Sequence, residues 1–509
     1  MNMENFLRSG YKGNLLALIA GALLTLSFAP FYIYPLAIIS PAVLFALWLR
    51  LNKKQAFWRG WIYGLGFFGT GVSWVFISIN EYSDATVAMA TILTMLFVAV
   101  LAVFPGFTGY LAKRFFKRRT ENQIIFAMPA IWLLLEWARS WIFTGFPWLL
   151  LGDSQLFSPL KGYAPVFGVY GITLAVAVSS GLLLNSAINF RKDNKKRAVI
   201  NLLIMGLIWS TGAGLSAIKW TKPSGDPIKV SLIQGNIDQG NKWDQSKLMP
   251  TLDLYKNLTE KHLDSKIIIW PEDAVPLPLQ YAEGFIEDVA DKAKANNSTV
   301  ITGIPVKNGE ENTYFNAVVA VGSNYSYYLK NRLVPFGEYT PLQKYLKGFM
   351  QQFNLPMANM VPGGIKNQKP LLIGDLKIAT FICYEIAYPE LARFKGDDTG
   401  ILLTVSNDAW FGKSIALAQH FAMAQMRSLE LGRPSIFVSN TGITAIAKPN
   451  GALQSSISPH KVNVLTDTIQ PMTGTTYWQK HGMDPILLMM LSFLFMSIKS
   501  QRRAKIRAS

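Results

Sequence analysis

Cysteine and histidine are scarce in this chain of 509 residues. It holds one cysteine, Cys383, and four histidines, namely His262, His420, His460 and His481. A single cysteine excludes a disulfide within the chain, and the scattered histidines do not form a zinc-ligand pattern with it. We therefore expect no metal site.

Charged residues are also few, at 16% of the chain, while half of it is apolar. Residues 13–218 are a succession of long hydrophobic runs, and residues 219–483 have the composition of a globular domain. A last apolar run over residues 485–498 precedes a basic tail. We predict a membrane domain with seven transmembrane helices over 1–218, a globular domain over 219–483, and a final transmembrane helix with its tail over 484–509.

The net charge of +18 does not indicate nucleic-acid binding once it is divided by segment. Residues 219–483 carry 26 Lys+Arg against 23 Asp+Glu, whereas the rest of the chain carries 23 against 8. The excess therefore belongs to the links between apolar runs, where basic residues mark the cytoplasmic face of a membrane.

Eight apolar runs are candidates for membrane spans, which need about 20 apolar residues each. The first, with Arg8 and Lys12 ahead of it, could alone pass for a signal peptide, but seven further runs favour a multi-pass membrane protein. The candidates are about 13–29, 31–49, 60–79, 86–112, 122–143, 166–190, 198–218 and 484–498.

Every second link between these runs is basic. The basic links lie within residues 50–59, 113–119 and 191–197 and in the tail, whereas the intervening links contain one basic residue, Lys161. By the positive-inside rule both termini are cytoplasmic, and the globular domain, which follows the seventh span, lies outside.

The globular segment alternates short strands with helices, which predicts a layered α/β fold. We expect helices at about 247–263, 282–296, 388–394 and 415–431. The expected strands are residues 228–234, 266–270, 299–303, 316–321, 325–334, 376–383, 401–406, 435–439 and 444–448.

Three reactive side chains stand within or at the ends of these strands: Glu272, Lys330 and Cys383. A cysteine at a strand-to-helix turn can act as a nucleophile, a carboxylate can take its proton, and a lysine can stabilise an oxyanion. Taken singly, each has an ordinary structural interpretation: an inert core cysteine, a capping glutamate, and a lysine that protects a sheet edge.

The strings around these residues resemble the Glu-Lys-Cys signature of the nitrilase superfamily: Trp270-Pro271-Glu272, Lys330 and Ile382-Cys383-Tyr384-Glu385. The layout of spans around a globular domain is similar to that of the apolipoprotein N-acyltransferase family. Two longer strings are similar to that family as well: Leu333-Val334-Pro335-Phe336-Gly337-Glu338-Tyr339 and Ser406-Asn407-Asp408-Ala409-Trp410-Phe411-Gly412.

The resemblance implies an αββα sandwich on the periplasmic face of the bacterial inner membrane, in a monomer. It implies transfer of a fatty acyl chain from a phospholipid, typically phosphatidylethanolamine, to the N-terminal amine of S-diacylglyceryl-cysteine on an apolipoprotein. Cys383 would form a thioester in a ping-pong reaction, with Glu272 as general base and Lys330 stabilising the oxyanion. No metal or organic cofactor is implied.

Further positions match functional residues of the family. Glu338 and Glu385 would hold Lys330 and the cysteine turn in place, as expected of groups that orient reacting residues. Trp243 and Trp410 would contact the acyl chains, although ordinary aromatic packing also explains them. Asn316 and Tyr384 complete the matching set.

Two other functions stay open. The first is a membrane-tethered amidase or nitrilase for small polar amides, for which eight spans are far more than a tether needs. The second is a transporter with a receptor domain, but the apolar runs contain few charges, chiefly Glu136 and Arg139. That pair is equally explained as an i,i+3 ion pair.

The orientation can be tested with reporter fusions. A reporter placed near Lys307 should behave as periplasmic and one placed after Arg507 as cytoplasmic, because the basic links alternate with the neutral ones. Paired alkaline phosphatase and fluorescent-protein fusions measure this. Both reporters on the same side would mean that the number of spans is wrong by one.

Overall fold

The computed structural model describes residues 10–83, 85–116, 120–309, 312–339, 359–364 and 369–506. The described chain divides into two compact units. The helical unit comprises residues 10–76, 88–219 and 480–506, and the sheet unit comprises 77–87 and 220–479. Parts of two expected basic links, residues 117–119 and 507, lie outside the described residues.

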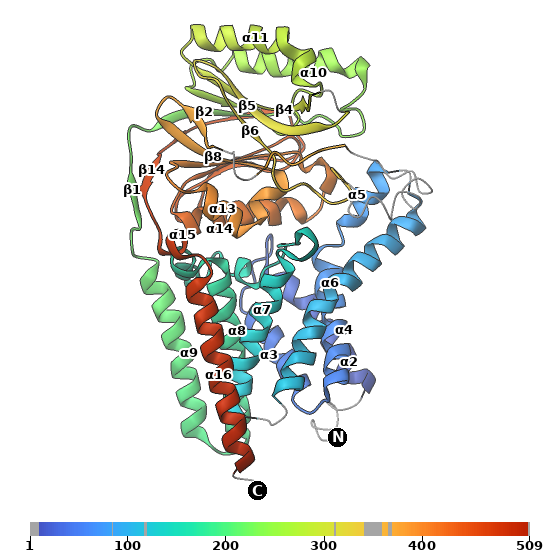
Figure 1. The fold of residues 1–509 in the computed structure, drawn as a ribbon, viewed down its shortest axis with the longest axis vertical. Helices are drawn as coiled ribbons and strands as arrows, with labels where there is room; N and C mark the ends of the chain where they lie inside the picture. The colour runs from blue at the N-terminus through green and yellow to red at the C-terminus, as the bar shows by residue number, and fades with distance from the viewer. Residues whose placement is uncertain are drawn as a thin grey trace. The chain divides into compact units, whose positions relative to one another are not determined.

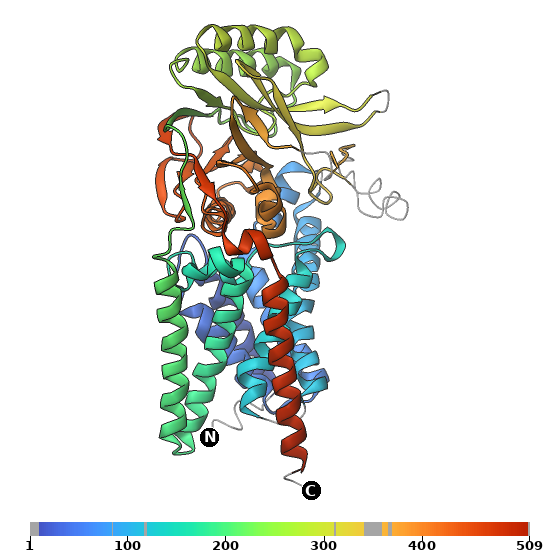
Figure 2. The same cartoon turned by 60° about the vertical axis from the view of Figure 1, so that its left-hand side comes forward.

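The helical unit contains apolar helices near each expected run (Figures 1 and 2). Two of them, α6 and α9, are long and apolar enough to cross a membrane, as is the segment Pro159–Arg191, which ends with α8. A fourth span results if α4 and the short helix α5 (Val75–Tyr82) count together, so the total of eight stays a prediction. The bounds are α2 (Gly10–Leu24), α3 (Leu36–Trp48), α4 (Lys53–Gly71), α6 (Val87–Phe115), α7 (Met128–Arg139), α8 (Ala164–Arg191), α9 (Lys195–Leu215) and α16 (Asp484–Ile506).

One expected span differs from the structure. We expected a single run over residues 60–79, but α4 begins at Lys53 and ends at Gly71, and α5 follows after a break. Asn52 caps α4 by accepting a hydrogen bond from the backbone of Gln55, whose side chain accepts one from the backbone of Asn52. This capping box makes Lys53 and Lys54 part of the helix and not of a link.

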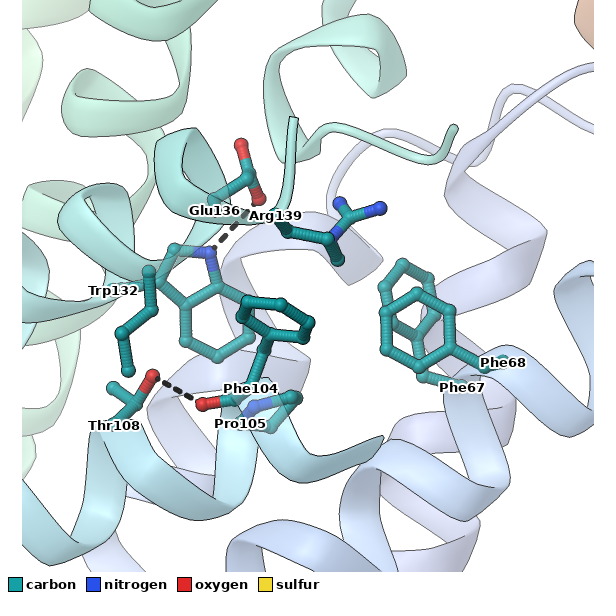
Figure 3. A pocket seen from close by; sticks show the side chains of 9 residues that line it. Phe67, Phe68, Phe104, Pro105, Thr108, Trp132, Glu136 and Arg139 are labelled. Atoms are coloured by element: carbon teal, nitrogen blue, oxygen red, sulfur yellow. Dashed lines mark hydrogen bonds between the residues drawn. The ribbon is translucent and has the colours of Figure 1, made fainter. Parts of the chain in front are cut away.

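Two buried charges of the helical unit, Glu136 and Arg139, hold an irregular segment in place. Glu136 accepts hydrogen bonds from Thr173 at 2.6 Å and from the backbone N–H of Leu151 at 3.1 Å. Arg139 donates to the carbonyl oxygens of Phe146 and Trp148, both at 2.6 Å. Figure 3 shows the two side chains above an aromatic pocket lined by Phe67, Phe68, Phe104 and Trp132. Buried backbone groups that lack a helical partner are satisfied in this way.

The sheet unit contains two six-stranded sheets, ordered β12-β11-β10-β9-β8-β7 and β13-β2-β3-β4-β5-β6, and a two-stranded pair β1-β14 (Figure 1). Strands β2, β3 and β4 are mutually parallel, as are β8, β9 and β10. The bounds are β1 (Thr221–Pro223), β2 (Ile228–Gln234), β3 (Ile267–Ile269), β4 (Thr299–Lys307), β5 (Tyr314–Gly322), β6 (Ser326–Leu329), β7 (Leu371–Ile373), β8 (Leu376–Ile382), β9 (Ile401–Ser406), β10 (Ser435–Ser439), β11 (Thr444–Ala447), β12 (Leu453–Ile457), β13 (Asn463–Ile469) and β14 (Met472–Gly474).

Helices cover the outer face of each sheet (Figure 1). Helices α10 (Gln245–Glu260) and α11 (Leu279–Ala295) pack on β2, β4 and β5, while α13 (Pro389–Lys395) and α14 (Ala416–Leu431) pack on β8, β10 and β11. The two sheets meet where β10 approaches β2 and β8 approaches β5. The unit is therefore a four-layered α/β sandwich, as expected for a nitrilase-like domain.

The central strands agree with the sequence pattern because they are continuous apolar runs, and β2, β9 and β10 have the expected bounds. The predicted strand over 325–334 is shorter, because the chain leaves the sheet after Leu329. Strands β1, β7, β12, β13 and β14 were missed. An edge strand with exposed polar side chains, such as Asn463–Ile469, lacks the continuous apolar run by which the central strands were predicted.

Gly303 of β4 lies against the turn that carries Glu272. A Cβ there would lie 2.6 Å from backbone atoms of Pro271, Glu272 and Asp273. Gly303→Ala should therefore displace this turn and lower the free energy of unfolding by ~1–3 kcal/mol. Thermal unfolding in detergent, followed by tryptophan fluorescence, measures the effect.

The matched control is Gly284→Ala on the exposed face of α11, where no heavy atom lies within 4 Å of the added Cβ. This change should stabilise the helix by up to about 1 kcal/mol. An unfolding midpoint for Gly303→Ala at or above that of the unmodified protein would contradict the close approach.

Candidate active site

The candidate residues follow strands of both sheets. Glu272 lies just beyond the carboxyl end of β3, Cys383 follows β8 directly, and Asn407 follows β9. Lys330 follows β6, the edge strand next to β5. In open α/β sheets, sites form beyond the carboxyl ends of parallel strands, because loops there bring together residues from several strands.

Lys330 lies at the centre of a buried charge cluster. Its side chain is 1% exposed, and its Nζ donates hydrogen bonds to Glu272 Oε1 at 3.0 Å and Glu338 Oε1 at 2.8 Å. Asn316 Nδ2 donates to the same two oxygens, at 2.8 and 2.9 Å. The structure thus brings four of the predicted residues into contact, and each carboxylate has partners for its charge.

The same contacts decide the protonation of Glu272. Burial alone raises the pKa of this carboxyl, but the charge of Lys330 and the hydrogen bonds from Asn316 and Lys330 outweigh burial and hold the pKa below its ordinary value. The backbone N–H of Asn407 also donates to Oε2 at 2.9 Å. Glu272 is therefore an ionised carboxylate at neutral pH, as a proton acceptor must be.

Lys330 is charged for the reciprocal reason. Burial opposes its charged form, yet Glu272 and Glu338 outweigh burial and hold the pKa of the ammonium well above its ordinary value. Glu338 is itself fixed by the backbone N–H of Val334, which donates to Oε2 at 2.7 Å. A fixed cation in a buried site stabilises a developing negative charge more than one in water.

Cys383 occupies a strained position at the end of β8. Its backbone φ is +52°, which is uncommon for a residue other than glycine, and its side chain is 7% exposed. Burial, followed by the negative charge of Glu272, raises the pKa of the thiol well above its ordinary value, while Lys330 opposes the shift. The resting thiol is therefore protonated and needs a base to become a nucleophile.

Glu385 fastens the cysteine turn to the segment that follows Lys330. Its Oε2 accepts a hydrogen bond from the backbone N–H of Ile382 at 2.9 Å, and its Oε1 accepts one from that of Asn331 at 2.7 Å. Tyr328 donates to both oxygens, at 2.8 and 2.9 Å. One buried carboxylate thus sets the spacing between the residues before Cys383 and after Lys330.

Comparison with known proteins identifies the family of this chain. Residues 20–182 match the apolipoprotein N-acyltransferase N-terminal domain, and residues 229–477 match the carbon-nitrogen hydrolase family. An apolipoprotein N-acyltransferase of Coxiella burnetii is 42% identical over 95% of this chain and 99% of its own length. Those of Azotobacter vinelandii and Pseudomonas putida are 39% and 40% identical, each over 98% of this chain and over 97% and 99% of their own lengths.

The chain belongs to the apolipoprotein N-acyltransferase family. Both halves contribute to this conclusion, since the matched segments cover the membrane-type helices and the sheet unit separately. Cys383 is the one cysteine of this family member, so any cysteine chemistry of the enzyme must use it.

The three aromatic candidates have different surroundings. Trp243 is 52% exposed, in the turn before α10. Trp410 contacts Tyr82 of α5 edge to face at 5.1 Å, and its carbonyl accepts a hydrogen bond from Ser78 at 2.7 Å. Tyr384 is buried and packs edge to face on Tyr388 at 5.2 Å. Trp243 thus presents a large exposed aromatic surface, whereas Tyr384 is enclosed.

Two buried groups that contact the turns of Cys383 and Glu272 were missed by the sequence analysis. His420 lies 3.1 Å from the carbonyl oxygen of Cys383 through Nε2 and 2.9 Å from Asp408 Oδ1 through Nδ1. Lys242 donates to the carbonyl oxygen of Glu272 at 3.2 Å. Asp408 stands in the family-like string after β9, which was the available signal, whereas nothing local distinguishes His420 or Lys242 from other polar residues of helices and turns.

The protonation of the resting thiol can be measured. Because the pKa of Cys383 is raised, its alkylation by iodoacetamide should accelerate about tenfold per pH unit from pH 7 to 9 without levelling off. Mass spectrometry reads the product unambiguously, since the chain has one cysteine. In denaturant the rate should instead level off above about pH 8.5. A plateau below pH 8 in the folded protein would show a preformed thiolate.

Proposed function

We propose that this protein transfers a fatty acyl chain from a phospholipid to the N-terminal amine of S-diacylglyceryl-cysteine on apolipoproteins, with Cys383 as nucleophile, Glu272 as general base and Lys330 as oxyanion-stabilising cation. The observation that carries the proposal is the buried contact between Glu272 and Lys330, with both groups acting electrostatically on the single thiol of an apolipoprotein N-acyltransferase family member.

In the first half-reaction, the sulfur of Cys383 attacks the carbonyl carbon of the phospholipid ester while Glu272 takes the thiol proton. Lys330 faces the negative charge that develops in the tetrahedral intermediate. When the intermediate collapses, the bond from carbon to the glycerol oxygen breaks, and the proton held by Glu272 passes to that oxygen. The products are a lysophospholipid and a thioester on Cys383.

In the second half-reaction, the amine of the acceptor attacks the thioester carbonyl and Glu272 accepts its proton. The bond from carbon to sulfur breaks, the amide forms and the thiol is restored by the proton from Glu272. The two substrates react in turn, so the acyl-enzyme must persist until the acceptor arrives.

The finer features of the proposal rest on the pattern of charges between the apolar runs and on what the family resemblance implies. They are eight spans with both termini in the cytoplasm, a catalytic domain over 219–483 in the periplasm of a bacterial inner membrane, phosphatidylethanolamine as donor and a monomeric enzyme. Alternation of basic and neutral links supports the orientation. Trp243 and Trp410 are proposed to contact the acyl chains.

A hydrolase of small amides is the competing function, because residues 229–477 match the carbon-nitrogen hydrolase family. The match of residues 20–182 to the acyltransferase N-terminal domain counts against it. The same experiment separates the two functions, since a small-amide hydrolase acquires no lasting acyl group from phospholipid.

The test is a time course of the mass of the purified protein with phospholipid alone and no apolipoprotein. We expect one acyl group on Cys383, and we expect Glu272→Gln and Lys330→Ala each to slow its formation by ~100-fold or more. Cys383→Ala serves as the matched control and should acquire none.

Rapid and complete acylation of Glu272→Gln would remove this carboxylate from the first half-reaction. An adduct of equal mass on Cys383→Ala would remove the cysteine from the mechanism. Addition of an apolipoprotein should discharge the acyl-enzyme of the unmodified protein.

A further inference from the structure

Lys242 is a buried cation close to the candidate catalytic residues. It lies in the turn between β2 and α10 and is 3% exposed. Its Nζ donates a hydrogen bond to the backbone carbonyl of Glu272 at 3.2 Å. Lysine is almost never fully buried without a compensating partner, so the burial of Lys242 beside a neutral backbone carbonyl requires an explanation.

The ammonium of Lys242 has more N–H donors than it has acceptors among the described residues. A lysine has three N–H donors, and among the residues that the structure describes, the Glu272 carbonyl is the acceptor that Lys242 reaches. Two donors are therefore left for another group. Because an unused donor on a buried charge is costly, a partner that forms during the reaction would account for the position.

The charges that shift the pKa of Lys242 include those of the proposed general base and the proposed nucleophile. Burial lowers the pKa of its ammonium, and Asp273, Glu272 and Cys383 oppose that shift, in decreasing order. Burial raises the pKa of the Asp273 carboxyl to about 6, so this group is mostly ionised at neutral pH and favours the charged form of Lys242. A negative charge on the sulfur of Cys383 favours that form as well, so Lys242 and the thiolate stabilise each other.

Lys330 has only one donor left for the reaction. Two of its donors are directed to Glu272 Oε1 and Glu338 Oε1, so one donor remains. A reaction that generates first a thiolate and then an oxyanion benefits from a second fixed cation.

We propose that Lys242 is this second cation: its unused N–H groups and its charge stabilise the negative charge that develops on Cys383 and on the tetrahedral intermediate. The part that concerns the intermediate rests on the proposed acyl transfer. The part that concerns the thiol does not, because it can be measured without any lipid.

A purely structural role for Lys242 makes the opposite prediction. If the lysine only holds the Glu272 turn through one hydrogen bond, its removal loosens the site and exposes Cys383, which speeds alkylation. If it stabilises the thiolate, its removal slows alkylation, because a smaller fraction of the thiol ionises. The sign of the change separates the two roles.

The experiment compares alkylation of Cys383 by iodoacetamide at pH 8 in the full-length protein. Lys242→Met keeps the length of the side chain and removes its charge, and we expect it to slow alkylation about tenfold. Lys242→Arg keeps the charge and should restore at least part of the rate. Lys247→Met, at an exposed position nearby, is the matched control and should leave the rate unchanged. Thermal unfolding of each variant shows whether it is folded during the measurement.

Unchanged or faster alkylation of folded Lys242→Met overturns the proposal. Slower alkylation that Lys242→Arg partly restores supports it, and acylation of Lys242→Met by phospholipid should then be slowed at least as much as alkylation. If the unmodified protein acquires no acyl group at all, the proposed function fails, while the alkylation result still decides the role of Lys242 at the thiol.

Discussion

Mutual neutralisation of buried charges is the constraint on which the candidate site depends. Lys330 is held between Glu272 and Glu338, and Asn316 donates to the same carboxylate oxygens. Removing Lys330 would leave two buried carboxylates without their cation, which costs more than the intact cluster contributes. The same cluster keeps Glu272 ionised while the neighbouring thiol of Cys383 stays protonated. The surroundings thus widen the difference in pKa that glutamate and cysteine already have as residue types.

The sandwich brings these groups together through strand ends. Glu272 follows β3 in one sheet and Cys383 follows β8 in the other, and the two sheets pack face to face. Glu385 then fixes the local spacing, because its carboxylate accepts hydrogen bonds from the backbone before Cys383 and after Lys330. A rigid scaffold of this kind reduces the reorganisation that the site needs during a reaction.

The helical unit uses its few charges differently. Glu136 and Arg139 satisfy backbone and side-chain groups of an irregular segment, so they provide structure and not a pathway for polar solutes. This use of both charges argues against the transporter alternative, which would need polar groups free to bind a passing substrate. Membership of the acyltransferase family is consistent with the apolar helices, because the proposed substrates carry acyl chains that reside in a membrane.

The sequence by itself determined the two-part organisation, the central strands and the candidate residues Glu272, Lys330 and Cys383. Long apolar runs and family-like strings are local properties that need no knowledge of distant contacts. Only the tertiary structure decided that Lys330 contacts both Glu272 and Glu338 and that Cys383 adopts a positive φ. It also decided that His420 contacts the turn of Cys383 and that Lys242 contacts the turn of Glu272. Hydrogen bonds between residues far apart in the chain, such as Glu272 and Lys330, depend on sheet order and packing. For that reason the edge strands and these buried partners could not be read from local sequence patterns.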